Sequence, residues 1–305
     1  MTVTAHPESH PFLPEKVMTH EMAIAIALAV ITTAGNLLVI VALYKDPFRE
    51  LRTTANYLLV NLAVADLIMG LVVEPIWALQ YWVKENGSNK SNYSIAVNVI
   101  LVLAVEASNL TVLSLTIERY IVLERPLQRE ALFSGKAVKI SIFLIWLTAL
   151  VISSLIIPFR DQREYTLFLF AGMGVFLLLI MLGLYIRMFI IIRKFNKSLL
   201  AQGAQAALVQ PGQAYITARK REQQVAKAIF LFYGTFALCW LPSVVVETIK
   251  YREPKIDEHI CRGLMFLGLF NSALNPVLYT FRMPSFWRAI KRMFNDFKVA
   301  CRQIL

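Results

Sequence analysis

The amino-acid sequence predicts an all-α fold, a seven-transmembrane helix bundle followed by a short C-terminal amphipathic membrane-surface helix. Hydrophobic residues make up 57% of the 305 residues and the mean hydropathy is +0.58, whereas soluble domains are roughly 45–50% apolar. A helix needs about 20 mostly apolar residues to cross a bilayer. Seven segments meet that requirement, at residues 22–44, 55–82, 96–122, 138–158, 166–193, 225–249 and 260–281.

Charge decides the orientation that we expect for these spans. Segments on the side of the C-terminus carry 22 of the 31 Lys and Arg residues, whereas the opposite segments carry nine basic and nine acidic residues. Basic loops face the cytoplasm. We therefore predict a multi-pass protein of the plasma membrane with an extracellular N-terminus (1–21), a membrane domain (22–283) and an amphipathic helix with a cytoplasmic tail (284–305). The excess of Lys and Arg in the cytoplasmic loops explains the net positive charge of the chain. We therefore expect the lipid bilayer, and no nucleic acid, as a partner.

The segments outside the spans carry further signals. Three sequons, at Asn86, Asn89 and Asn92, fall in the second loop between spans; because that loop is assigned to the outside, they predict a glycoprotein. Residues 198–217 are small and polar, which predicts a flexible cytoplasmic loop. After the last span, large apolar residues recur at helical spacing between basic ones, as in a helix lying on the inner membrane surface. Just beyond that helix, Cys301 is a candidate for palmitoylation; a buried or free thiol is the alternative.

Polar residues inside the spans are candidates for functional sites, because they are costly in a bilayer. Asp66 lies in the middle of the second span, and other spans supply amide and hydroxyl oxygens at a comparable depth. Such an oxygen set can hold a small hard cation such as Na⁺; a hydrogen-bonded network that only ties helices together is the alternative. The residues of this set besides Asp66 are Asn36, Ser108, Asn271, Ser272 and Asn275.

A second polar group ends the third span, where Glu118, Arg119 and Tyr120 follow an apolar run. An arginine at that position needs a partner or a function. Glu222, at the cytoplasmic start of the sixth span, has the right sign to pair with Arg119 across the bundle, and breaking such a pair would free two helix ends. The alternative for Glu222 is an unpaired surface acid. Prolines in the spans permit kinks, and Trp240 and Tyr279 lie close to Pro242 and Pro276.

Taken together, these motifs resemble those of the rhodopsin-like (class A) G-protein-coupled receptors. The motifs read GNLLV with Asn36, NLAVADL with Asp66, ERY at 118–120, Trp146, CWLP at 239–242 and NPVLY at 275–279. They occur in the family's order, and the resemblance covers the chain beyond residue 20. The resemblance implies a receptor that binds an extracellular ligand in the bundle and activates a heterotrimeric G protein at its cytoplasmic face.

The resemblance also implies roles for individual residues. Those for G-protein coupling and the activation switch are Glu118, Arg119, Tyr120, Tyr185, Glu222, Asn275, Pro276 and Tyr279. Those for an allosteric sodium pocket are Asp66, Ser108, Asn271, Ser272 and Asn275. Those for the ligand pocket, with Trp240 as its floor, are Glu74, Leu101, Val105, Trp240, Glu247, Met265 and Leu269.

Departures from the family pattern narrow the expectation. Ser94 stands where the family has a disulfide cysteine, the external loop after the fourth span is short, and Leu177 replaces a proline of the fifth helix. These features resemble the branch of melanocortin, cannabinoid and lysophospholipid receptors. Leu101 stands where receptors for monoamines carry an aspartate, which favours a basic peptide or a lipid as the ligand over a monoamine.

The sequence supports two other classes of function less well than a receptor. A seven-helix transporter or channel is the alternative, but neither inverted repeats nor a run of ionisable residues across the membrane is apparent. An enzyme is not expected, because no histidine falls in a span and no nucleophile–base pair can be proposed. Glu74, Glu106 and Glu247 remain as acids of the outer half that could attract a cationic ligand, although for Glu106, expected to face the fourth and fifth helices, pairing with polar neighbours or water is the favoured reading.

Overall fold

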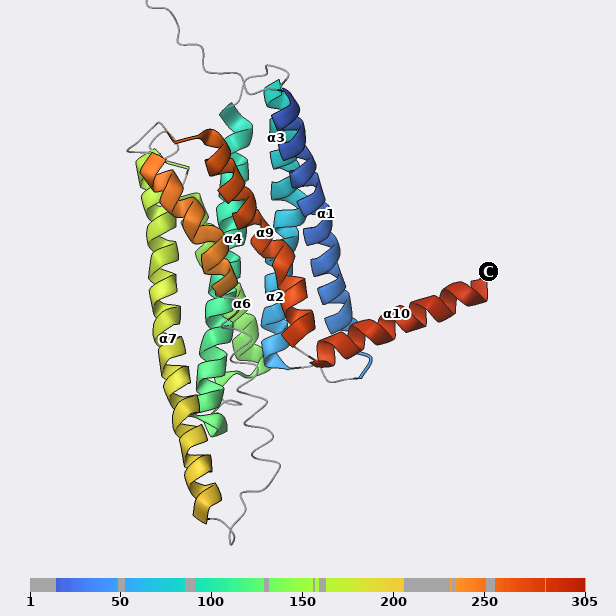
Figure 1. Ribbon diagram of the computed structural model, residues 1–305, viewed down its shortest axis with the longest axis vertical. Coiled ribbons are helices and arrows are strands. Elements are labelled where there is room, and N and C mark those ends of the chain that lie inside the picture. Colours follow the sequence, from blue (N-terminus) through green and yellow to red (C-terminus); the bar gives the residue numbers. More distant parts are fainter. Residues whose placement is uncertain are drawn as a thin grey trace, which may run out of the picture.

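The structure is a computed structural model, and it describes residues 15–48, 53–85, 91–128, 132–155, 157–158, 163–205, 231, 234–250, 256–282 and 284–304. All the regular elements in these ranges are helices, so the predicted all-α class is confirmed. Figure 1 shows the long helices standing side by side, with α10 leaving the inner end of the bundle. Here "inner" means the end at which α10 begins, and "outer" the opposite end.

The predicted spans correspond to helices, and the helices of the first, third, fifth and seventh spans extend beyond the apolar segments. The first span is α1 (Glu15–Lys45), the third is α4 (Ser91–Glu124) and the fourth is α6 (Gly135–Ser154). The fifth is α7 (Arg163–Gln205), the sixth is helical over 234–250, and the seventh is α9 (Glu258–Arg282). A short 3₁₀ turn, η2 (Pro126–Gln128), follows α4, and α10 (Pro284–Ile304) ends the chain.

The second span is one rod with an irregular turn in its middle. It consists of α2 (Thr54–Ile68), the π-helical turn η1 (Met69–Val73) and α3 (Glu74–Glu85). Pro75 follows the turn and has no N–H to donate to the carbonyl one turn earlier, so the wider turn accommodates it. Gly70 within η1 lets α1 come close, since a Cβ there would lie 2.7 Å from Thr33 Oγ1.

Three boundary predictions were wrong. Helix α7 continues to Gln205, so residues 198–205 of the predicted loop are helical; they are rich in Leu, Ala and Gln, which favour helix. Helix α4 begins at Ser91, which places Asn92 in its first turn rather than in a loop. Cys301 lies inside α10 rather than just beyond it. Asn86 and Asn89 lie outside the described residues.

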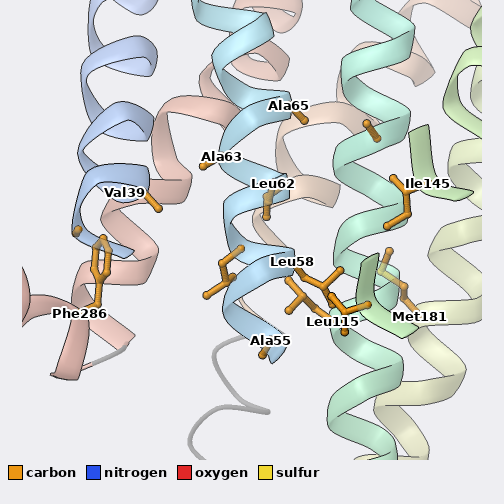
Figure 2. Close-up of a cluster of buried hydrophobic side chains, with 14 of the residues drawn as sticks. Val39, Ala55, Leu58, Leu62, Ala63, Ala65, Leu115, Ile145, Met181 and Phe286 are labelled. Atoms are coloured by element: carbon orange, nitrogen blue, oxygen red, sulfur yellow. The ribbon is translucent and has the colours of Figure 1, made fainter. Parts of the chain in front are cut away.

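The inner half of the bundle packs around one cluster of buried apolar side chains. Figure 2 shows Leu58 and Leu62 of the second span directed at neighbouring helices, and Leu115 and Met181 meeting beside them. Phe286 of α10 belongs to the same cluster, together with Val39 of α1, and it is only 1% exposed. Burial of one aromatic ring contributes about 1.5–3 kcal/mol, and this ring fixes the start of α10 against the bundle.

The outward faces of the helices are apolar. Phe143, Phe176, Leu179 and Phe189 are each more than half exposed, which a water-soluble surface would not tolerate as continuous stripes. Within the described residues, five helical stretches are long and apolar enough to cross a membrane: His20–Lys45, Ala55–Leu79, Ile95–Glu124, Gly135–Ser154 and Gly172–Phe195. The chain is therefore a multi-pass membrane protein whose core and lipid-facing surface are both apolar.

Candidate functional site

The junction of α1 and α9 is built around a proline. Pro276 lies inside α9 and cannot bond the carbonyl of Ser272, four residues earlier. Asn36 of α1 supplies the missing donor, since its Nδ2 donates to the Ser272 oxygen at 3.1 Å and to the Thr32 oxygen at 2.9 Å. Gly35 makes the approach feasible, because a Cβ there would lie 2.9 Å from Pro276 Cγ. The GN and NP pairs of the sequence thus form one contact.

Next to this junction, Asp66 joins the second and seventh spans. Asn275 Nδ2 donates to Asp66 Oδ2 at 2.7 Å, and Ser272 lies within hydrogen-bonding reach of the same carboxylate. Asp66 is fully buried, and its Oδ1 has no hydrogen-bond partner among the described residues. Ser108 and Asn271 are buried as well. The structure therefore brings Asp66, Ser272 and Asn275 together as the sequence predicted.

The donor set around Asp66 fits a monovalent hard cation. The site offers one carboxylate with an unpaired oxygen, and hydroxyl and amide oxygens stand on neighbouring positions of α4 and α9. Oxygen ligands of this kind suit a small hard ion, and one carboxylate balances one positive charge. Within the described residues there is no cluster of three or more acidic, histidine or cysteine side chains of the kind that holds a transition metal.

A second network ties the second, third and fourth spans together. Trp146 Nε1 donates to Asn61 Oδ1 at 2.8 Å, and Asn61 Nδ2 donates to Thr111 Oγ1 at 2.7 Å. Thr111 in turn donates to the Ala107 carbonyl at 2.6 Å. Trp146 and the NLAVADL segment, which begins with Asn61, are among the sequence motifs, but Asn61 was given no role and Thr111 was not named. Both are polar residues inside apolar spans, and that pattern could have marked them as candidates for contacts between helices.

At the inner end of α4, Arg119 is held by its neighbour. Arg119 Nε lies 2.6 Å from Glu118 Oε2, and the two side chains are 7% and 0% exposed. A buried ion pair of this kind is strongly destabilised when one partner is removed. One turn earlier, Thr116 Oγ1 lies 3.5 Å from the hydroxyl of Tyr185 on α7, which is itself buried.

Some of the predicted switch residues cannot be placed. Glu222 lies outside the described residues, so its pairing with Arg119 stays a prediction. The backbone of Tyr279 belongs to α9, but its side chain is not described. Tyr120 is half-buried at the inner end of α4. The structure therefore pairs Glu118 with Arg119 and places Tyr185 next to Thr116, one turn earlier on α4. The roles of Glu222 and of the Tyr279 side chain stay predictions.

The predicted ligand-pocket residues of the outer half form an apolar cluster. Leu101 and Val105 of α4 and Leu269 of α9 are buried together with Trp240, and Met265 packs against them. The Trp240 indole lies flat against Gly268, where a Cβ would be 3.0 Å from its ring. Phe236 stands 6.4 Å from Trp240 between ring centroids, tilted by 33°. Among these residues, none offers a charge to a ligand.

The acids predicted for the ligand pocket, Glu74 and Glu247, do not belong to this apolar cluster. Glu74 is completely buried, and its Oε1 accepts a hydrogen bond from Thr32 Oγ1 at 3.2 Å. It therefore faces α1, and a ligand could reach it only by parting α1 from α3. Glu247 is half-buried on the segment 234–250. At the outer end, Arg262 Nε of α9 pairs with Glu21 Oε1 of α1 at 3.0 Å, an ion pair that the sequence analysis did not foresee.

Glu106 faces the fifth span, as expected, and also the sixth. It is 1% exposed and lines a cavity with residues of α7 and of the segment 234–250. Among the described residues of that lining, none comes from the fourth span. Its carboxylate accepts a hydrogen bond from Asn109. Cys239 and Cys261 are free buried thiols. The side chain of Cys301 is not described, so its palmitoylation stays a prediction.

Comparison with known proteins shows which family has this arrangement of helices and motifs. Residues 35–279 match the family described as 7 transmembrane receptor (rhodopsin family). The alpha-1A adrenergic receptor of Oryzias latipes is 25% identical over 94% of this chain and 70% of its own length. The adenosine receptor A2a of Canis lupus familiaris is 24% identical over 90% of this chain and 72% of its own. The crystal structure of squid rhodopsin matches 98% of this chain and 92% of its own with a TM-score of 0.80 at 19% identity, a likeness of fold.

Proposed function

Because the chain belongs to the rhodopsin family of seven-transmembrane receptors and is a G-protein-coupled receptor, we propose that it binds an extracellular ligand in the outer half of its bundle. The ligand activates a heterotrimeric G protein at the inner face. The observation that carries the proposal is the buried pair of Glu118 and Arg119 at the inner end of α4. The plasma membrane is the proposed location, with the N-terminus outside.

The inner switch works by exchanging partners of one arginine. While Glu118 holds Arg119 at 2.6 Å, the guanidinium is 7% exposed and unavailable to another protein. Movement of the inner ends of α7 and the sixth span, the latter carrying Glu222, would open a site beside Arg119. The arginine would then present a fork of N–H donors to the carbonyl and carboxyl oxygens of a G-protein segment. Tyr120, Tyr185 and Tyr279 are the tyrosines proposed to take part in that change.

The middle of the bundle would transmit the ligand signal to that switch. Trp240 belongs to the outer cluster and Phe236 packs against it. On α9, Asn275 bonds Asp66 and is followed by Pro276. A sodium ion held by Asp66, Ser108, Asn271, Ser272 and Asn275 would stabilise the arrangement seen here, since an ion that binds only one state favours that state. The ion would supply charge neutralisation for the buried carboxylate.

The outer half favours a ligand with an apolar body. Leu101, Val105, Met265 and Leu269 offer hydrophobic contact and no charge, which supports a lipid. Glu247 is the acid of the predicted pocket that is partly exposed, and it could meet the basic group of a peptide. An ordinary monoamine anchored at Leu101 is disfavoured by the same residues.

The test of this function is guanine-nucleotide exchange. The full-length receptor and its Arg119→Ala variant are placed in lipid nanodiscs with purified G proteins of each class, with and without a ligand panel of lipids and basic peptides. We expect the parent to catalyse exchange and Arg119→Ala to lose at least nine-tenths of it, a difference of about 1.4 kcal/mol or more. Arg288→Ala on the exposed side of α10 serves as the control for loss of one positive charge. Ion conductance without any nucleotide exchange would overturn the receptor function.

A further inference from the structure

A cavity between α4, α7 and the segment 234–250 contains a buried carboxylate. Its volume is about 30 Å³. Glu106 is 1% exposed, and its Oε2 has no hydrogen-bond partner among the described residues. Asn109 and the indole N–H of Trp240 are the other polar groups that side chains bring to the lining. The rest is apolar or aromatic: Gly174, Val175, Leu178, Phe236 and Leu241 among others.

Water alone satisfies this site poorly. The volume would admit about two water molecules, at roughly 10–15 Å³ each, but a buried water needs two to four polar partners. The polar side chains of the lining are Glu106, Asn109 and the indole N–H of Trp240, and the first two already interact with each other. A buried carboxylate without a partner costs several kcal/mol. A positively charged donor would offset that cost directly.

The cavity also reaches the lipid-facing surface of the bundle. Val175 of α7 and Leu241 of the segment 234–250 both line it, and each is 43% exposed. Other exposed side chains of the same two helices, such as Phe176 and Leu238, are large and apolar. A chain of methylene groups could therefore run from Glu106 outward between the two helices into the hydrocarbon of the bilayer.

We propose that this cavity is a binding site for a lipophilic primary amine, with the ammonium group at Glu106 and the alkyl body between Val175 and Leu241. The inference rests on the proposed ligand-binding function and names the chemical class of ligand. Glu106 lies five residues beyond Leu101 on α4, about 7.5 Å along the helix and about 140° around it. The acid therefore faces α7 and the sixth span, next to Phe236 and Trp240 at the border of the outer apolar cluster.

An occupant of this site would act on the moving parts of the bundle. It would touch Phe236 and Trp240, whose ring centroids are 6.4 Å apart. A group wedged beside these rings changes how α4 packs against the segment 234–250. Because the inner end of the sixth span carries the proposed switch partner of Arg119, occupancy would bias the inner face.

Equilibrium dialysis tests the site without a G protein. The probe is radiolabelled n-octylamine with the full-length chain in lipid nanodiscs, and empty nanodiscs measure partitioning into lipid. We expect saturable binding of one amine per chain, weakened at least tenfold in Glu106→Gln. The uncharged analogue 1-octanol should bind at least tenfold more weakly than the amine. Asp296→Asn, which removes an exposed acid of α10, should leave binding unchanged.

A glycine pair gives a second test that does not depend on the acid. A Cβ at Gly174 or at Gly183, both on α7, would meet no atom within 4 Å, but only Gly174 lines the cavity. Gly174→Val should therefore weaken amine binding at least tenfold, and Gly183→Val should not. Absence of saturable binding above empty nanodiscs, equal binding of amine and alcohol, or binding that survives both Glu106→Gln and Gly174→Val would each overturn the proposal. None of these outcomes changes the nucleotide-exchange result for Arg119→Ala.

Discussion

The inner and outer halves of the bundle handle buried polar groups differently. In the inner half, Asn36, Asn61 and Trp146 each bond a group on another helix at 2.7–3.1 Å. In the outer half, Glu74 accepts a hydrogen bond from Thr32 and Glu106 lines a cavity with Asn109. Each of these acids keeps one carboxylate oxygen without a hydrogen-bond partner among the described residues. Hydrogen bonds between helices favour one arrangement of the bundle, even though Asn36 Oδ1 has no partner among the described residues. An unpaired carboxylate oxygen instead favours a species that brings it a donor.

Asp66 stands where the two halves meet and shares features of both. One of its oxygens accepts the 2.7 Å bond from Asn275, and the other is unpaired. The difference between the halves thus suggests a division of labour. Interhelical bonds in the inner half stabilise one conformation. Farther out, unpaired carboxylate oxygens would bind a cation or a ligand that favours one conformation over another.

The largest effect is expected from a substitution that removes the ion pair of the inner half. Glu118→Gln removes the charge that holds Arg119, and a buried pair that loses one partner is destabilised by about 3–5 kcal/mol. Basal nucleotide exchange should rise roughly tenfold, which needs a shift of only about 1.4 kcal/mol between states. Exchange is measured without ligand at equal receptor concentration, with Asp296→Asn as the control. Exchange equal to or below that of the parent would show that Glu118 does not restrain Arg119.

The next largest effect is expected from a substitution at the close contact between α1 and α9. In Gly35→Ala the new Cβ would lie 2.9 Å from Pro276 Cγ, so α1 and α9 must part. Overpacking of this kind costs about 1–3 kcal/mol, and thermal unfolding should occur at a lower temperature. Gly183→Ala is the matched control, because a Cβ there meets nothing within 4 Å and alanine favours helix. If both variants unfold at the same temperature as the parent, the α1–α9 junction is looser than described.

The smallest effect concerns the cation at the border of the two halves. If sodium binds at Asp66, the parent should unfold at a higher temperature in NaCl than in KCl of equal ionic strength. At a salt concentration about five times the dissociation constant, the gain is about 1 kcal/mol. Asp66→Asn should abolish the difference between the salts. A sodium effect that persists in the variant would place the ion elsewhere, and its absence in the parent would leave a network that only ties helices together.

Much of the fold follows from the chain itself. Apolar length set the spans, and the charge difference between loops set the expected orientation. The order of motifs such as GNLLV and NPVLY indicated the family. Helix ends were less well determined, because Leu, Ala and Gln beyond a span continue a helix without being apolar enough to signal it. This explains the helix over residues 198–205. The added first turn of α4, residues 91–95, is largely polar and carries no such signal.

For the candidate site, the sequence identified the residues but not their partners. It predicted that Asp66 and Asn275 share a pocket, and that Arg119 needs an acid. It could not show that Asn36 supplies the donor that Pro276 lacks, because those residues are 240 positions apart. It also could not show that Glu106 faces the sixth span as well as the fifth, since a rotation of α4 about its axis leaves the sequence pattern unchanged.

The sequence by itself therefore determined which groups must leave water: the apolar spans and the few polar residues within them, whose cost in a bilayer marks them individually. Only the tertiary structure decided which of those polar groups meet. Periodicity fixes the face of one helix, but the pairing of faces depends on how side chains such as Gly35, Gly70 and Phe286 allow helices to approach. Asp66 and Glu106 differ for that reason alone, because packing gave one an amide from α9 and the other a cavity beside α7.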